Sequence, residues 1–334
     1  MKSSFMVIIL LGFLTACDKD DFLDNFDNQI LFATPTEVEL NAISQDWTSR
    51  DLSPDDYRLE QIIELTSNGA ILKIVSYRVN GFKEYGALII PESSIPLPIR
   101  MQIFGFSKEV TTNSFRLNLN DDSDLPFIFA IPALRGQSLR ITINNEEYTT
   151  PTSEGRHCDA FDGATDDALA FLNIIESTET NADFNRVAVN GGSRGGTVAL
   201  LMGEHDERIK RVVGVVAPTN MLELTSRNEN DTTYQCQFLQ ELVSGNITIE
   251  EARYKMIASS PIYFAKNLPL TQLHMAENDQ NVPLSQGEQL LDVMTNLGLG
   301  ESFELFVYEN RTHSNIGMEN QELTSRIQQF LSQL

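Results

Sequence analysis

One serine in this sequence lies in a motif that typically carries a nucleophile. Ser193 lies in GGSRG, residues 191–195, which fits G-x-S-x-G, a tight turn between a strand and a helix that exposes a serine hydroxyl. Residues 186–190 are typical of the strand, and the helix follows from residue 197. The serine in such a turn takes an unfavourable positive φ. Glycines flank it because a side chain there would collide where strand and helix approach closely. The motif predicts a nucleophile at Ser193, with the Arg194 amide as an oxyanion donor.

A glycine-rich turn between a strand and a helix can also bind phosphate. The spacings that phosphate binding requires are missing here. No Gly-Lys-Ser/Thr is present in the turn, and the glycines at 191, 192, 195 and 196 do not form G-x-G-x-x-G. We therefore interpret the turn as a nucleophile elbow.

A serine nucleophile needs a base, because its hydroxyl is hardly ionised at neutral pH. The chain has four histidines. His157 precedes the serine, His205 lies on the helix of the elbow, and His274 lies inside a predicted strand. His313 follows the last predicted strand, at the sheet edge where Ser193 is expected. We therefore predict that His313 is the base.

The base in turn needs a carboxylate that orients its imidazole. Asp279 lies in a turn directly after a predicted strand and is the preferred candidate. Glu277, two residues closer to the strand, is an alternative. Asp231, in a region without strands, is a third candidate.

Strand and helix patterns alternate along most of the chain, which predicts an α/β fold with a mostly parallel sheet and helices on both faces. A helix over 36–47 is expected to be capped by Thr36. Residues 218–261 predict a lid-like insertion with helices over 235–243 and 248–257. The eight predicted strands are 71–79, 85–90, 99–104, 127–131, 186–190, 212–216, 268–275 and 302–308.

The N-terminal residues are typical of a targeting segment. Residues 1–16 combine Lys2 with a short apolar run, and the ending Leu-Thr-Ala-Cys resembles the lipobox of bacterial lipoproteins. Cys17 is then the predicted lipid attachment site. Residues 17–35 are expected to be a flexible tether, and 36–334 the globular domain. The acidic run after Cys17 resembles a surface-export tag, so we expect the protein in the bacterial cell envelope, at the outer membrane or cell surface.

The charge and the cysteine and histidine content of the chain limit which ligands and macromolecules it is expected to bind. The net charge of −23 argues against nucleic acid, because phosphates would be repelled. We also predict no metal and no cofactor, since no histidine and cysteine stand at the spacing of metal ligands. Cys158 and Cys236 remain in a chain expected in an oxidising compartment. They are interpreted either as a disulfide or as two buried thiols.

Three segments together resemble the catalytic domain of the prolyl oligopeptidase family and its α/β-hydrolase relatives, over roughly residues 65–333. They are GSRGG around Ser193, ENDQNVP around Asp279 and RTH ending at His313, joined by IPALRG at 131–136. The resemblance implies an α/β-hydrolase fold with Ser193, Asp279 and His313 as the triad. The loop usually written His-Gly-Gly is Phe104-Gly105-Phe106 here, and we assign the second oxyanion donor to the Phe106 amide.

The resulting hypothesis is a lipid-anchored serine hydrolase that cleaves an ester or a peptide bond through an acyl-enzyme. Its partners would be a small ester or short peptide, and a membrane through the lipid anchor only. One alternative is a peptidase of the prolyl oligopeptidase type, although the chain has no room for the β-propeller of those enzymes. Another is a non-catalytic binding lipoprotein on a hydrolase scaffold.

Overall fold

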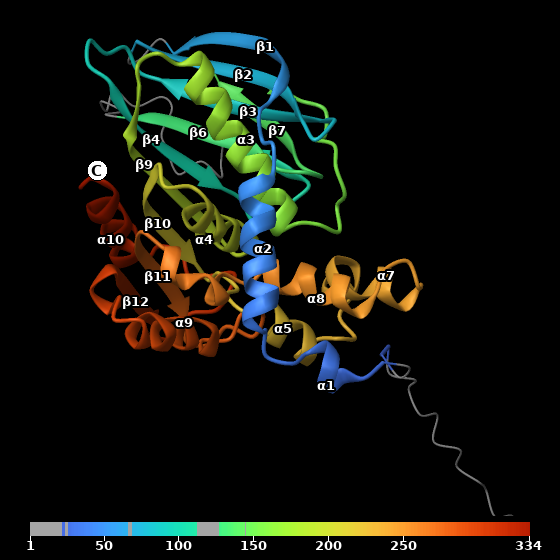
Figure 1. The fold of residues 1–334 in the computed structure, drawn as a ribbon. Coiled ribbons are helices and arrows are strands. Elements are labelled where there is room, and N and C mark those ends of the chain that lie inside the picture. The colour runs from blue at the N-terminus through green and yellow to red at the C-terminus, as the bar shows by residue number, and fades with distance from the viewer. Residues whose placement is uncertain (1–21, 24–25, 66–68, 112–126, 144) are drawn as a thin grey trace, which may run out of the picture.

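The computed structural model describes residues 22–23, 26–65, 69–111, 127–143 and 145–334. These residues form one large sheet with helices on both faces, and a small second sheet beside its N-terminal strands (Figure 1). The signal segment predicted over 1–16, and Cys17, lie outside the described residues.

The large sheet has nine strands, in the order β1-β2-β3-β6-β4-β9-β10-β11-β12. The first four strands in this order pair antiparallel, and β6 and the remaining strands pair parallel. The carboxyl ends of the parallel strands therefore meet at one edge. The strands are Asp55–Leu65 (β1), Ala70–Val79 (β2), Phe82–Ile90 (β3), Leu97–Ile103 (β4), Ile128–Ala133 (β6), Ala182–Gly192 (β9), Ile209–Val215 (β10), Leu270–Ala276 (β11) and Phe303–Tyr308 (β12).

Apolar residues on both faces of the sheet explain its layers. One face packs against α3 (Asp162–Thr178), α4 (Arg194–His205) and α9 (Ser285–Asn296). The other face packs against α10 (Gln321–Leu331) at the C-terminal strands. At the N-terminal strands that face packs on the small sheet of β5 (Glu109–Thr111), β7 (Ser138–Ile143) and β8 (Glu146–Thr149). The central parallel strands are consequently covered on both sides, as such strands require.

The prediction of eight strands was wrong by one in the large sheet, and the small sheet was not foreseen. The added strand is β1, which lies before the first predicted range, 71–79. Its first eight residues are exposed, and Gln61 interrupts the apolar alternation that runs from Tyr57 to Leu65, which weakens the strand pattern. The hairpin between β2 and β3 turns at Asn80 and Gly81, as their sequence predicts, with φ of 51° and 81°.

The described part of the predicted tether is packed instead of free, which corrects that prediction. Leu23 and Leu31 are buried in the same apolar cluster as the insertion, and Leu31 ends α1 (Asn28–Leu31). The next helix, α2 (Glu37–Ser49), has the expected Thr36 cap, in a capping box with Glu39. Figure 1 shows α2 running past α3 and α4 towards α8.

The insertion after β10 is helical, with more pieces than expected. It consists of α5 (Met221–Arg227), α6 (Thr232–Tyr234), the π-helix η2 (Gln235–Leu239), α7 (Gln240–Val243) and α8 (Ile249–Ala258). Cys236 in η2 forms a disulfide with Cys158, which precedes α3. That bond decides between the two interpretations of these cysteines. It also ties the insertion to the body of the domain.

Candidate active site

Ser193 lies between β9 and α4 with φ 54° and ψ −127°, a backbone conformation that residues other than glycine rarely adopt. The flanking glycines are sterically required. A Cβ on Gly191 would lie 2.1 Å from the Gly195 oxygen, and one on Gly195 would lie 2.4 Å from the Ile103 oxygen. The Ser193 amide donates to the Val215 oxygen at 2.8 Å, which fixes the turn at the carboxyl edge of the sheet.

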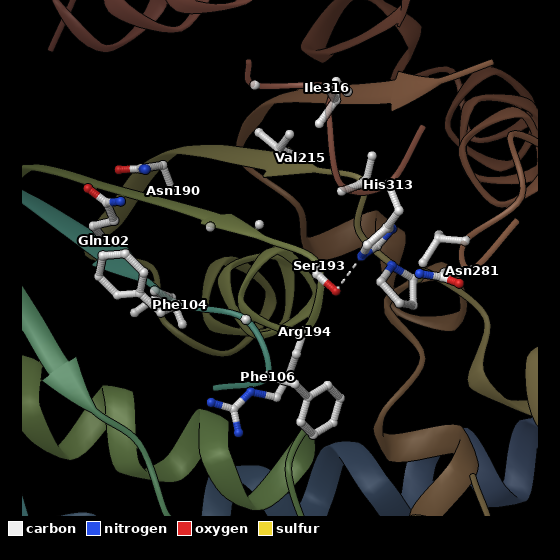
Figure 2. Close-up of a pocket in the computed structure, with 18 of the residues that line it drawn as sticks. Gln102, Phe104, Phe106, Asn190, Ser193, Arg194, Val215, Asn281, His313 and Ile316 are labelled. Atoms are coloured by element: carbon white, nitrogen blue, oxygen red, sulfur yellow. Dashed lines mark hydrogen bonds between the residues drawn. The ribbon is translucent and has the colours of Figure 1, made fainter. Parts of the chain in front are cut away.

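The structure brings together the three residues expected to act as nucleophile, base and acid. His313 Nε2 lies 2.9 Å from Ser193 Oγ, and His313 Nδ1 lies 2.7 Å from Asp279 Oδ2 (Figure 2 shows the first contact). The Asp279 side chain is fully buried, whereas that of His313 is 21% exposed. Asp279 Oδ1 accepts the amides of Asn281 and Val282 at 2.8 and 2.9 Å. Because an ionised carboxylate only accepts, Nδ1 carries a proton and Nε2 is left free to accept from Ser193.

The loops that carry the acid and the base also hold each other. The Asn278 amide donates to the Arg311 oxygen at 2.9 Å, and the Glu277 amide donates to the Tyr308 oxygen at 3.1 Å. The Glu277 carboxylate accepts the Asn310 amide at 3.0 Å, so it braces the histidine loop and does not contact the imidazole.

The remaining candidates for acid and base lie elsewhere. Asp231 caps α6 by accepting the Thr233 amide at 2.7 Å. His205 is buried against Trp47, with ring centroids 3.7 Å apart, and His274 Nδ1 pairs with the Tyr308 hydroxyl at 2.9 Å. Burial lowers the pKa of both imidazoles to about 3. His157 packs against Gly136, away from Ser193.

The loop after β4 lies against the nucleophile and carries the predicted second oxyanion donor. A Cβ on Gly105 would lie 3.4 Å from the Ser193 Cβ. Gln137 Nε2 donates to the Gly105 oxygen at 3.0 Å. A trans peptide directs its N–H opposite to its C=O, so the Phe106 amide points away from Gln137.

Gln137 is a positioning residue that the sequence analysis did not single out. It also donates to the Ser107 oxygen at 3.1 Å, and its side chain is buried. The signal that was available is its place directly after the Arg135-Gly136 of the resemblance, where Gly136 takes φ 79°.

A cavity of about 1410 Å³ opens at Ser193. It is lined on one side by β4 and β9, on another by the insertion through Tyr234 and Gln237, and beside Ser193 by Phe106 and Arg194. Figure 2 shows His313 and the Arg194 side chain on opposite sides of Ser193. Burial raises the pKa of Tyr234 to about 12, so its hydroxyl is neutral. The lining mixes aromatic rings with a few polar groups, as small-molecule sites do.

Within the described residues, no three histidine, cysteine or acidic side chains gather in a cluster that would suit a metal ion. In the same part of the chain no helix has the length and apolar character needed to cross a bilayer.

Comparisons with known proteins were made in sequence and in structure. The model of the prolyl oligopeptidase family matches residues 160–334, which include Ser193, Asp279 and His313. A sequence search of curated proteins finds no match.

Among solved structures, the chain resembles an acetyl xylan esterase from Paenibacillus sp. R4, with 16% identity, a TM-score of 0.66 and coverage of 90% of this chain and 98% of that one. Acetyl xylan esterase 1 from Thermoanaerobacterium sp. JW/SL YS485 matches with 16% identity and a TM-score of 0.63, and the match covers 88% of this chain and 92% of that one. The Pyrococcus horikoshii acylaminoacyl peptidase matches with 13% identity and a TM-score of 0.54. That match covers 83% of this chain but only 49% of the peptidase chain. At these identities the likeness shows the fold alone, and that fold is the α/β-hydrolase fold, with nine strands here instead of eight.

Proposed function

Because the chain belongs to the prolyl oligopeptidase family and is a serine hydrolase, we propose that it cleaves small esters through an acyl-enzyme formed on Ser193. The observation that carries this proposal is the hydrogen-bonded series from Ser193 through His313 to Asp279. No member of the series is missing, which argues against a scaffold that only binds ligands.

Each group has a definite part in the proposed reaction. His313 Nε2 takes the Ser193 proton as Oγ attacks the carbonyl, and later gives it to the leaving group. Asp279 holds the imidazole and stabilises the charge that it gains. The Arg194 amide is the first of α4 and has no acceptor inside the helix, so it is available to the oxyanion. The Phe106 amide is proposed as the second donor.

Ester substrates are preferred over peptides for a reason of architecture. The two acetyl xylan esterases are covered over 92% and 98% of their chains, whereas the acylaminoacyl peptidase is covered over 49% of its chain. The described residues form the two sheets named above and no propeller that would select short peptides. The family match itself favours the second candidate, a short peptide.

The test is labelling and turnover of the purified protein. A fluorophosphonate probe should label the wild type and not Ser193→Ala, and the variant should lose at least about 10⁴-fold in turnover of p-nitrophenyl acetate. An unlabelled wild type, or a variant that still turns over the ester, would refute the proposal. Comparison with a peptide p-nitroanilide of matched size then separates the two substrate classes.

We also propose that Cys17 carries the lipid that attaches the protein to the cell envelope, with residues 1–16 removed. The lipobox-like sequence supports this. The disulfide between Cys158 and Cys236 is consistent with an oxidising compartment. Cys17→Ser should move the protein from the membrane fraction to the soluble fraction, because acyl chains provide the anchor. Retention of that variant on membranes would contradict the assignment.

A further inference from the structure

Arg194 has a side chain whose environment the triad does not explain. It is only 2% exposed, yet its Nε and Nη2 have no hydrogen-bond partner in the described part of the chain. An unpaired buried cation is strongly unfavourable, because the protein must replace the water that it has lost. Such a group commonly stores strain at a functional site.

The other arginines buried in the described residues show what a satisfied guanidinium looks like here. Arg135 binds Asp167 through Nε and Nη2 at 2.9 and 2.7 Å, and binds Asp159 as well. Arg253 binds both oxygens of Glu39 at 2.7 and 3.1 Å. Arg194 differs from both because no carboxylate of the described residues pairs with it.

The carboxylate whose charge acts on Arg194 is already occupied. Asp167 attracts Arg194, but its two oxygens accept from the backbone and side chain of Arg135. Burial and the Arg135 charge lower the pKa of Arg194 to about 10, so it still carries its charge at neutral pH. The ring of Phe106 covers the guanidinium, with Cζ 5.0 Å from the ring centroid. This contact is weaker than the charge-assisted hydrogen bonds that the other arginines make.

The cover can move. Phe106 is 44% exposed, and its ring meets the Phe161 ring in a T-shaped arrangement with centroids 5.8 Å apart. Both rings and Arg194 line the cavity beside Ser193. A rotation of the Phe106 side chain would therefore open the guanidinium to a ligand in the cavity.

The position of Arg194 determines which part of a substrate it would meet. The leaving group must lie next to His313, which protonates it. The Arg194 side chain lies on the opposite side of Ser193 (Figure 2). The acyl part of a substrate whose leaving group lies at His313 would extend to that side. Since Arg194 directly follows the nucleophile, its guanidinium is within one side-chain length of the reacting carbonyl.

We propose that the substrates are esters whose acyl part carries a free carboxylate a few bonds from the scissile carbonyl, and that Arg194 pairs with that carboxylate once the Phe106 ring turns aside. This rests on the proposed function and names its substrate class. A planar guanidinium suits a carboxylate because two N–H groups bind its two oxygens in parallel. The net charge of −23 would repel such substrates at long range, so recognition depends on this short-range pair.

The test compares two p-nitrophenyl esters of equal chain length, the anionic hydrogen glutarate and the neutral valerate, after subtraction of their spontaneous hydrolysis. The wild type should favour the glutarate in kcat/KM. The ratio of the two kcat/KM values should fall at least about 10-fold in Arg194→Met, and less in Arg194→Lys, which keeps the charge. The ratio is measured within each variant, so a general change in turnover does not affect it.

Binding gives a second readout that does not depend on turnover. In the Ser193→Ala background, monomethyl glutarate should bind at least about 10-fold more tightly by calorimetry with Arg194 than with Met at that position. Methyl valerate should bind equally to both. Equal binding of monomethyl glutarate, or an unchanged kinetic ratio, would overturn the proposal while leaving the Ser193 assignment intact. Loss of fluorophosphonate labelling in the wild type would instead refute the proposed function.

The melting temperature of Arg194→Met distinguishes substrate recognition by Arg194 from a purely structural role. If the guanidinium is unpaired in the free protein, Arg194→Met should raise the melting temperature, because a strained charge has been removed. A lower melting temperature together with an unchanged ratio would show that Arg194 serves the fold through Asp167, and the proposal would fall.

Discussion

Replacing Asp279 by Asn tests the acid with hardly any change in shape. Oδ1 of Asp279 accepts two backbone amides, from Asn281 and Val282. In the variant only the amide oxygen can take that place, because an NH₂ group cannot accept. The NH₂ must then face His313 Nδ1, where Oδ2 lies 2.7 Å away in the wild type.

That arrangement forces the wrong tautomer on the base. With an N–H donor facing it, Nδ1 of His313 becomes the acceptor and the proton moves to Nε2. Nε2 lies 2.9 Å from Ser193 Oγ and can then no longer accept its proton. We expect kcat for a p-nitrophenyl ester to fall about 10⁴-fold, equivalent to about 5.4 kcal/mol of transition-state stabilisation.

The matched control is Glu277→Gln. Glu277 accepts the Asn310 amide at 3.0 Å, and the amide oxygen of Gln can accept the same bond. We expect its kcat to change less than about threefold, well under one kcal/mol. Circular dichroism should show both variants folded. If Asp279→Asn keeps most of its activity, or if Glu277→Gln loses the larger share, Asp279 is not the orienting acid.

Three further predictions concern the fold around the site. Gly195→Ala places a Cβ 2.4 Å from the Ile103 oxygen, so it should lower the unfolding free energy by roughly 3 kcal/mol and abolish activity. The control is Gly300→Ala, whose Cβ would lie 3.8 Å from its nearest atom and should leave denaturant unfolding unchanged. Glu84 is fully buried, and burial together with the charge of Asp167 raises its pKa to about 10, so the folded state holds a proton that the unfolded state releases above pH 4.5. Wild-type stability should therefore fall between about pH 5 and 10, by up to about 1.4 kcal/mol per pH unit relative to Glu84→Gln, and parallel pH profiles would refute this. Cys158→Ala should lower the unfolding free energy by roughly 4 kcal/mol, since the disulfide spans 78 residues, and adding Cys236→Ala should cost nothing more under non-reducing conditions.

The placement of Ser193, Asp279 and His313 beside one another could be predicted because their signals are local. GGSRG carries its own steric reason, and Asp279 and His313 each follow a strand directly, so the sheet edge that holds one also holds the others. The preference for Asp279 over Glu277 came from the family pattern. The structure gives a physical ground for it, since Asp279 is the carboxylate next to the imidazole.

What could not be predicted depends on contacts distant in sequence. Gln137 reaches a carbonyl 32 residues away, and its place directly after Arg135-Gly136 does not indicate which backbone it binds. The strand β1 is held by its pairing with β2, because its own apolar alternation is interrupted at Gln61. Likewise, Leu23 and Leu31 pack on helices more than 180 residues further along, so an acidic N-terminal segment gave the impression of a free tether.

The attachments of the insertion bear on how substrates enter. Besides the disulfide, Tyr254 on α8 donates to Asp46 of α2 at 2.5 Å, and Arg253 binds the carbonyls of Ile30, Leu31 and Ala33. Because these contacts hold the insertion in place, it does not close over the substrate like a hinged lid, and little conformational entropy is lost when a substrate binds. Catalytic turnover then does not wait for closure of the insertion, and the movement that our proposal requires on binding is confined to the Phe106 side chain.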